Sequence, residues 1–165
     1  MDVLEREAGA GERTRGAIPW ERLLWYLVFG AAFGFTEAAV VAYLRRLLGE
    51  APGLDYREIF AAKGLPFSSA AIAADFARAG LLTPERCREM GTLLMLLGVA
   101  MAGGRSAKER LAVFLFTFAV WDLAYYAFLV PLTGFPRGLG QTDIYFLVPF
   151  AWYGPVWFPV VVVMP

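Results

Sequence analysis

The chain has 165 residues, of which 59% are hydrophobic and 18% charged, and its basic and acidic residues balance exactly in number. It therefore has no basic surplus that would indicate nucleic-acid binding. The sequence contains no histidine and a single cysteine, Cys87, which excludes an internal disulfide, Ser-His-Asp nucleophiles and histidine zinc sites. Long apolar runs separated by short charged segments are typical of an integral membrane protein.

Residues 1–19 are polar and carry both charges, so they predict a flexible N-terminal tail. They lack the apolar core and cleavage site of a signal peptide. We expect residues 20–165 to form a single all-α domain, an integral membrane bundle of four transmembrane helices. The first span is predicted at residues 23–44, which are enough to cross a hydrocarbon core of roughly 30 Å.

Small residues recur every four positions along this first span, at Gly30, Gly34 and Ala38. On a helix they form one smooth face, which lets another backbone approach closely. The pattern predicts helix packing, either within the chain or against a partner.

The segment between the first and second spans is mixed. Residues 68–82 are rich in alanine, with Ile72 and Phe76 on one helical face, and are too short and too charged to span. An amphipathic helix lying at the membrane interface is favoured, and a re-entrant segment is the alternative. The second span is then predicted at residues 84–104, where Pro84 follows a threonine and precedes a glutamate, as at helix starts.

The third span is predicted at residues 111–132 and the fourth at residues 144–165, which carry no charge. Prolines and a glycine interrupt the fourth run, at Pro149, Gly154, Pro155 and Pro159. Because proline lacks an N–H, these residues predict a broken helix in which the carbonyls of Ala151 and Pro155 are free to bind a cation or water.

Two acidic residues lie deep inside predicted spans, Glu37 in the first and Asp122 in the third, whereas those of the second span lie in its first turns. An ionisable residue at such a depth costs about 2.5–3.5 kcal/mol to insert, so each is a candidate functional residue. Tyr125 and Tyr126 follow Asp122 by one turn, and either phenol is expected to donate a hydrogen bond to its carboxylate.

Helix directions place further charges at the same end as Glu37. Glu89 near the start of the second span and Asp143 before the fourth lie on that side, so these carboxylates are expected to line one vestibule down to Asp122. The expected counter-charges are Arg86 and Arg88. The alternative is a purely structural role, in which the acids pair with neighbours and lock the bundle.

Four sequence pieces carry a resemblance to a group of known proteins. They are Phe35-Thr36-Glu37, Arg88-Glu89-Met90-Gly91-Thr92-Leu93-Leu94, Val120-Trp121-Asp122 and Trp152-Tyr153-Gly154-Pro155. With them the chain resembles small bacterial multi-pass membrane proteins that have no assigned activity. The resemblance implies a four-span fold and brings no activity with it.

Three functions remain open. The first is a non-catalytic membrane subunit or scaffold that packs against a partner or a second copy through Gly30 and Gly34. The second is an ion- or proton-linked transporter that uses Glu37, Asp122 and the broken fourth helix. The third, a carboxylate-metal enzyme, is the weakest, because bundle metal sites pair glutamate with histidine.

No cofactor or metal is expected, and the surroundings are the lipid bilayer of a bacterial inner membrane. The basic turn at residues 103–110 contrasts with the nearly uncharged loop at residues 133–143. The positive-inside rule then favours both termini in the cytoplasm.

Overall fold

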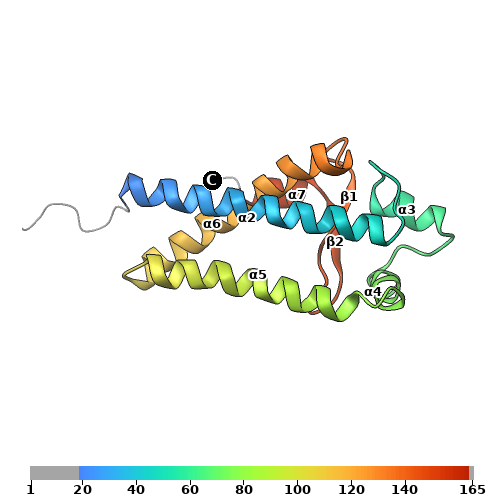
Figure 1. The fold of residues 1–165 in the computed structure, drawn as a ribbon, viewed down its shortest axis with the longest axis horizontal. Coiled ribbons are helices and arrows are strands. Elements are labelled where there is room, and N and C mark those ends of the chain that lie inside the picture. Colours follow the sequence, from blue (N-terminus) through green and yellow to red (C-terminus); the bar gives the residue numbers. More distant parts are fainter. Residues whose placement is uncertain (1–18, 164–165) are drawn as a thin grey trace, which may run out of the picture.

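The computed structural model describes residues 19–163 and is mostly helical (Figure 1). The predicted tail at residues 1–19 therefore lies, apart from Pro19, outside the described residues. Three helices are long. In chain order the elements are α2 (Trp20–Leu47), α3 (Tyr56–Ala62), α4 (Ser69–Arg78), α5 (Leu82–Gly103), α6 (Ala107–Thr133), β1 (Thr142–Phe146), β2 (Trp152–Pro155) and α7 (Trp157–Val162).

Helices α2 and α6 pack closely along the small-residue face of α2. A Cβ atom added at Gly34 would lie 2.6 Å from the carbonyl oxygen of Trp121, and one at Gly30 would lie 2.8 Å from Cβ of Val120. Ala38, one turn further along, is fully buried in a cluster that includes Tyr125. The smooth face is thus covered by another helix of the same chain.

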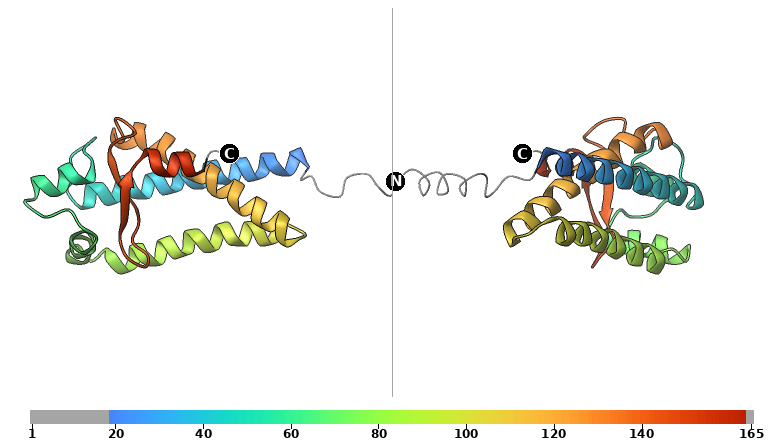
Figure 2. Two further views of the ribbon diagram at one scale, coloured as in Figure 1. Left: turned by 180° about the vertical axis from the view of Figure 1, so that it is seen from behind. Right: turned by 60° about the vertical axis from the view of Figure 1, so that its left-hand side comes forward.

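Helix α6 starts beside α5 at the turn that joins them and then diverges from α5 toward α2 (Figures 1 and 2). Near the turn, Tyr26 of α2, Ala100 of α5 and Val113 of α6 form one buried cluster. Ser106 begins α6 by accepting a hydrogen bond from the backbone N–H of Glu109 at 3.2 Å. At the diverging end, the β1–β2 hairpin lies between α5 and the other two long helices.

The predicted fourth span is wrong, because residues 144–165 contain no long helix within the described part of the chain. Its residues instead form most of the hairpin and the short α7. Pro149 lies between the strands, Gly154 and Pro155 lie in β2, and Pro159 lies inside α7. Three prolines remove the N–H groups that a continuous helix needs, while the aromatic and β-branched residues of β1 favour a strand.

The hairpin is antiparallel, with Thr142 opposite Pro155 and Ile144 opposite Tyr153, and an irregularity follows Ile144. It is held at its base by backbone bonds from Val156 to the carbonyl of Gln141 and from Trp157 to that of Leu139, both at 2.9 Å. A two-stranded ribbon is marginal by itself, so its position depends on contacts with the helices.

Helices α3 and α4 are present between α2 and α5, as a short helical segment was expected there. Their N-termini are capped by Asp55 and Ser68. Ile72 and Phe76, the apolar face predicted to lie on the membrane surface, are buried against Phe60 of α3 and Leu147 of the hairpin. That face therefore contributes to a protein core, which corrects the interfacial prediction for this face of α4.

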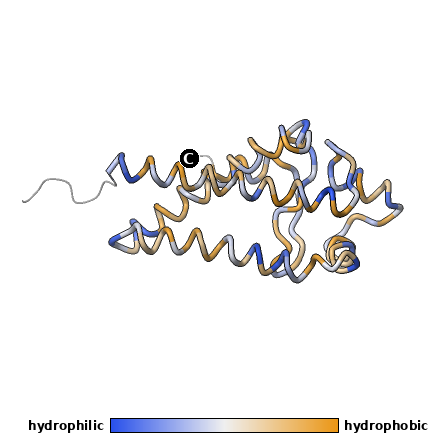
Figure 3. Tube along the Cα trace, viewed as in Figure 1, coloured by the Kyte–Doolittle hydropathy of each residue, from blue (hydrophilic) through white to orange (hydrophobic). Residues whose placement is uncertain are grey.

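Two of the described helices, α2 and α6, are long and apolar enough to cross a membrane, so the four candidate spans expected are reduced to two. Helix α5 is 22 residues long, but any stretch of about 18 residues in it includes Arg86, Arg88 and Glu89. Polar residues gather at the ends of the long helices and near the start of α5, and apolar residues fill the middle of all three (Figure 3).

Candidate functional site

A cavity of about 290 Å³ lies at the diverging end of the long helices, where the hairpin packs between them. The second half of α2, the first turns of α5, the middle of α6 and strand β1 supply most of its wall, and Tyr56 and Phe76 come from α3 and α4. Its ionisable or phenolic wall residues include Glu37, Glu85, Arg88, Glu89, Asp122, Tyr125, Tyr126 and Asp143. All six residues of the predicted intramembrane polar site are therefore brought to one cavity.

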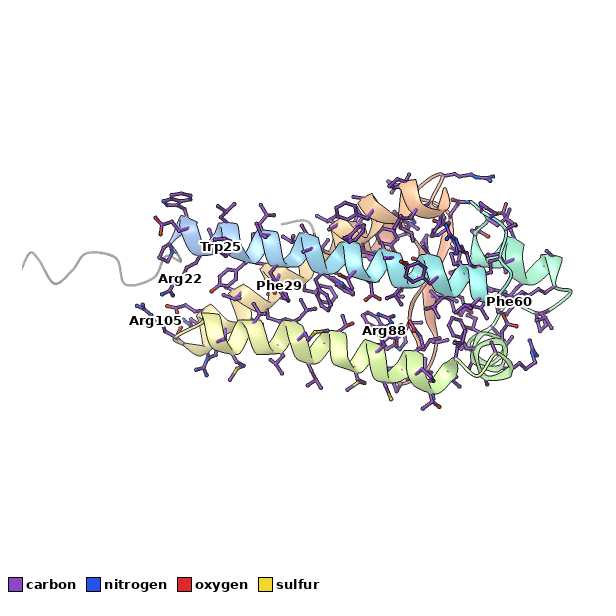
Figure 4. The ribbon with its side chains drawn as sticks, viewed as in Figure 1. Arg22, Trp25, Phe29, Phe60, Arg88 and Arg105 are labelled. Carbon is purple, nitrogen blue, oxygen red and sulfur yellow. The ribbon has the colours of Figure 1, made fainter. Side chains whose placement is uncertain are left out.

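Arg88 links two helices across this cavity. Its side chain points from α5 into the space between α5 and α2 (Figure 4), where Nη1 donates to Oε1 of Glu37 at 2.5 Å. The same guanidinium donates to Glu85 one turn earlier on α5, with Nε 2.9 Å from Oε1. The single guanidinium of Arg88 thus hydrogen-bonds two carboxylates, which its planar arrangement of N–H donors allows.

Glu89 holds the hairpin. Both of its carboxylate oxygens accept the backbone N–H of Leu147, at 2.9 and 2.8 Å. From the preceding turn of the same helix, Nε of Arg86 donates to the carbonyl of Leu147 at 3.0 Å. These two side chains satisfy both backbone groups of one residue. Arg86, expected as a counter-charge for the acids, binds backbone instead.

The two tyrosines expected beside Asp122 bind a different acid. The phenols of Tyr125 and Tyr126 donate to Oδ2 of Asp143, at 3.4 and 3.1 Å, and Oδ1 accepts the backbone N–H of Ile144 at 2.9 Å. The predicted hydrogen bonds to Asp122 are therefore wrong. The hairpin brings Asp143 over the tyrosine face of α6, which adjacency along the helix cannot reveal.

Asp122 is left with an unsatisfied oxygen. It is 8% exposed, and its Oδ2 has no hydrogen-bond partner among the described residues. Trp121 is 5% exposed, and its indole Nε1 also lacks a partner within the described part of the chain. Both residues line the cavity. One residue with an unpaired buried acceptor and one with an unpaired buried donor therefore line the same cavity, and leaving such groups unpaired costs about 1–3 kcal/mol each.

The carbonyls expected to be free in a broken fourth helix are both occupied. Ser69 Oγ on α4 donates to the carbonyl of Ala151 at 2.7 Å, and the phenol of Tyr145 donates to that of Pro155, also at 2.7 Å. The prediction that these carbonyls are free is therefore wrong, because a side-chain hydroxyl group already donates to each of them. The prolines lie in and around a hairpin, and the two carbonyl oxygens accept hydrogen bonds from side chains.

The rest of the cavity wall is largely aromatic. Rings of α6, the hairpin and α7 border it, namely Phe118, Trp121, Tyr145, Phe146, Trp152 and Phe158. The rings of Trp121 and Phe146 lie 6.3 Å apart between centroids, so α6 and β1 meet through them. The cavity thus combines carboxylates with ring faces, both of which attract cations.

Negative charge exceeds positive charge at this site. The described residues that line the cavity include five carboxylates and one guanidinium, that of Arg88. Arg45 lies outside the lining but attracts Asp143. Glu89 accepts only a backbone N–H, and Asp122 Oδ2 accepts nothing among the described residues. Glu89 and Asp122 are therefore two lining acids whose carboxyl groups contact no cationic side chain among the described residues.

The sequence patterns did not single out some of the residues that line the cavity. Glu85 is three residues before Arg88, and this spacing places both on one helix face. Their pairing could therefore have been predicted from the sequence. Trp121 and Tyr145 could not be predicted as site residues, because aromatic residues are abundant throughout the apolar runs.

Among residues 19–163, no group of three acidic or cysteine side chains is arranged to hold a metal ion. No family model, curated protein or solved structure matches the chain.

Proposed function

We propose that the protein is a small membrane transporter that carries a cation, or a proton, by way of the carboxylate-lined cavity. The observation that carries the proposal is the surplus of buried carboxylates around one internal space, with Asp122 unpaired there among the described residues. Ionisable residues are expensive in a membrane and usually mark ion or substrate pathways when they face a cavity.

The outer surface of the long helices supports a membrane location. Helices α2 and α6 are apolar enough to cross a bilayer. Helix α5 is a third proposed span, because its outward residues Leu94, Met95, Leu97 and Met101 are between 47% and 62% exposed. Such an apolar surface is unfavourable in water and suits lipid. Three crossings and a re-entrant hairpin replace the four helices expected from the sequence.

The orientation of these crossings is proposed from the basic residues. Arg105, Lys108 and Arg110 lie at the turn between α5 and α6, which is at the same end as the start of α2 (Figure 1). At the opposite end, Arg45 is 4% exposed and pairs with Glu50 at 3.0 Å, so it offers little free charge. The opposite end also carries Arg46, Arg57, Lys63, Arg78 and Arg137. The orientation is therefore proposed from the density of basic residues in the short α5–α6 turn, which by the positive-inside rule would lie with the start of α2 in the bacterial cytoplasm.

A non-catalytic subunit was the first expectation, with the face of Gly30 and Gly34 as the contact surface. That face is covered by α6 of the same chain. A subunit would have to use another surface, and the cavity would then have no evident purpose. The transport proposal accounts for both the packed glycines and the unpaired acid.

Charge movement tests the proposal directly. The protein is reconstituted in liposomes, and transient currents on a solid-supported membrane are recorded after jumps in pH or in the concentration of sodium, potassium or a small primary amine. We expect a current from the unaltered protein and its loss in Asp122→Asn, because the amide keeps the shape and removes the charge. Glu37→Gln is expected to reduce the current as well, since it frees Arg88 to neutralise other acids.

Asp75→Asn is the matched control, because Asp75 lies on α4 in surface pairs with Lys63 and Arg78. It should leave the current unchanged. Absence of any current from the folded protein, or an undiminished current in a folded Asp122→Asn variant, would overturn the proposal. Detection of a second protein in a fixed ratio by native mass spectrometry would instead support the subunit function.

A further inference from the structure

We propose that the cavity binds a small organic ammonium ion that also carries a hydrogen-bond acceptor, with Asp122 and Trp121 as its polar contacts. The inference rests on the proposed function, for which it names the chemical class of the transported cation. The juxtaposition of an unpaired acceptor and an unpaired donor on one cavity wall carries it.

The unpaired atoms specify what the ligand must offer. Oδ2 of Asp122 is an acceptor on an acid, so its complement is an N–H or O–H, and a positively charged N–H gives the stronger bond. Nε1 of Trp121 is a donor only, so its complement is an oxygen or another acceptor. Both residues come from one turn of α6, and a ligand with both groups satisfies them together.

The charge and shape of the wall favour an organic cation over an inorganic one. An inorganic cation needs several oxygen ligands around a single point. Within the described part of the chain the acids are not grouped in that way, and the wall between them consists mainly of aromatic rings. Ring faces attract ammonium groups through their negative charge distribution and also accommodate an apolar body.

The other acids already have assigned partners, which leaves Asp122 as the ligand contact. Arg88 donates hydrogen bonds to Glu37 and Glu85. The tyrosine phenols donate to Asp143, and the backbone N–H of Leu147 donates to Glu89. With a volume of about 290 Å³ the cavity lies near the lower end of the range of small-molecule sites, roughly 300–1,000 Å³. It therefore suits a single amine with one ring or a short chain.

Three matched probes test the inference by calorimetry on the protein in phosphatidylglycerol nanodiscs, whose headgroups carry no ammonium. Phenylethanolamine has the ammonium, the hydroxyl and a ring. Styrene glycol replaces the ammonium with a hydroxyl, and phenylethylamine lacks the hydroxyl. We expect phenylethanolamine to bind best, styrene glycol at least about tenfold more weakly, and phenylethylamine in between, because a charged hydrogen bond contributes more than a neutral one.

Two variants assign the contacts. Asp122→Asn should weaken phenylethanolamine at least about tenfold and leave styrene glycol unchanged, since only the charge is removed. Trp121→Phe keeps a ring and should abolish the preference for phenylethanolamine over phenylethylamine. Asp75→Asn is the control and should bind like the unaltered protein. Thermal unfolding of each variant establishes that it is folded, and Trp121→Phe remains informative if Asp122→Asn does not fold.

Equal binding of phenylethanolamine and styrene glycol, or no binding of either, would overturn the inference. Unchanged phenylethanolamine affinity in a folded Asp122→Asn variant would do the same. Displacement of phenylethanolamine when phosphatidylethanolamine is added to the nanodiscs would support the ammonium chemistry and identify a lipid headgroup as its source, whereas no displacement would indicate a free amine.

The inference and the proposed function fail separately. If phenylethanolamine binds through Asp122 but no probe or ion drives a current, the ligand class stands and transport is wrong. If a pH jump drives an Asp122-dependent current but no amine binds, the transporter is proton-linked and the ligand class is wrong.

Discussion

Near the turn between α5 and α6 the long helices contact one another directly, whereas at the opposite end a β-hairpin lies between α5 and the α2–α6 pair. The first region is apolar, with Tyr26, Ala100 and Val113 packed together. The second contains several buried charges, a cavity and two unpaired polar atoms.

The comparison shows what a hairpin requires when it replaces a helix. A helix satisfies its own backbone groups, so neighbouring helices can meet through small or apolar side chains. A short hairpin leaves outward-facing N–H and C=O groups that other residues must satisfy. Glu89, Arg86 and Ser69 do so for Leu147 and Ala151. The charged character of this region follows partly from that backbone requirement.

The largest expected effect is in the polar region, at Arg88. In Arg88→Met, Glu37 and Glu85 lose their shared partner, and we expect unfolding to become easier by about 3 kcal/mol or more. Thermal unfolding in detergent measures this. Arg78→Met removes a surface pair whose arginine side chain is 58% exposed, and should cost less than about 1 kcal/mol. A similar loss in both variants would show that burial of the pair contributes nothing.

The second-largest effect on stability is expected at the small-residue face of α2. Gly34→Leu forces a side chain against the backbone of α6, and we expect a loss of about 2 kcal/mol or more in stability. Gly98→Leu is the matched control, since a Cβ at this exposed position of α5 meets nothing within 4 Å. It should be neutral or slightly stabilising because leucine favours a helix more than glycine does. Equal stability of the two variants would contradict the close contact of α2 with α6.

A smaller effect is expected at the link between α5 and the hairpin. Glu89→Gln retains one acceptor oxygen but removes the charge, so the bond to Leu147 should weaken by about 1–2 kcal/mol. Hydrogen–deuterium exchange of the Leu147 amide should then become faster. The same exchange should stay unchanged in Glu58→Gln, because glutamine can replace glutamate in the capping box of α3. Slow exchange at Leu147 in both variants would show that the carboxylate does not hold the hairpin.

The smallest effect is expected at the surface of α4. Partial burial acts to raise the pKa of Asp75, but hydrogen bonds from Lys63 and Arg78 outweigh it and lower that pKa below its ordinary value of 3.8. The ionised form therefore stabilises the folded state at neutral pH. Asp75→Asn should cost less than about 1 kcal/mol there, and the difference from the unaltered protein should shrink as the pH falls below 3.8. A difference that grows toward acidic pH would contradict this sign.

The three long helices were predictable, because uncharged runs bounded by charges determine them locally. Glu37, Glu89 and Asp122 could also be singled out, since acids in apolar helices are rare. Their partners could not. Tyr125 and Tyr126 adjoin Asp122 in sequence yet bind Asp143, which belongs to a strand that hydropathy alone presents as part of a fourth helix. The two strands are neighbours in the chain. The place where their hairpin docks depends on contacts with Tyr126 and Glu89, which are distant in the chain, and local patterns do not contain that information.

The Glu89–Leu147 bond also has a consequence for the order of assembly during synthesis. Leu147 follows Glu89 by 58 positions, so α5 is synthesised before the backbone N–H that the Glu89 carboxylate accepts. Glu37 precedes Arg88 by 51 positions, and that pair can form as soon as α5 emerges. We therefore expect the helices to associate first through Arg88, with the Glu89 carboxylate remaining hydrated until the hairpin docks.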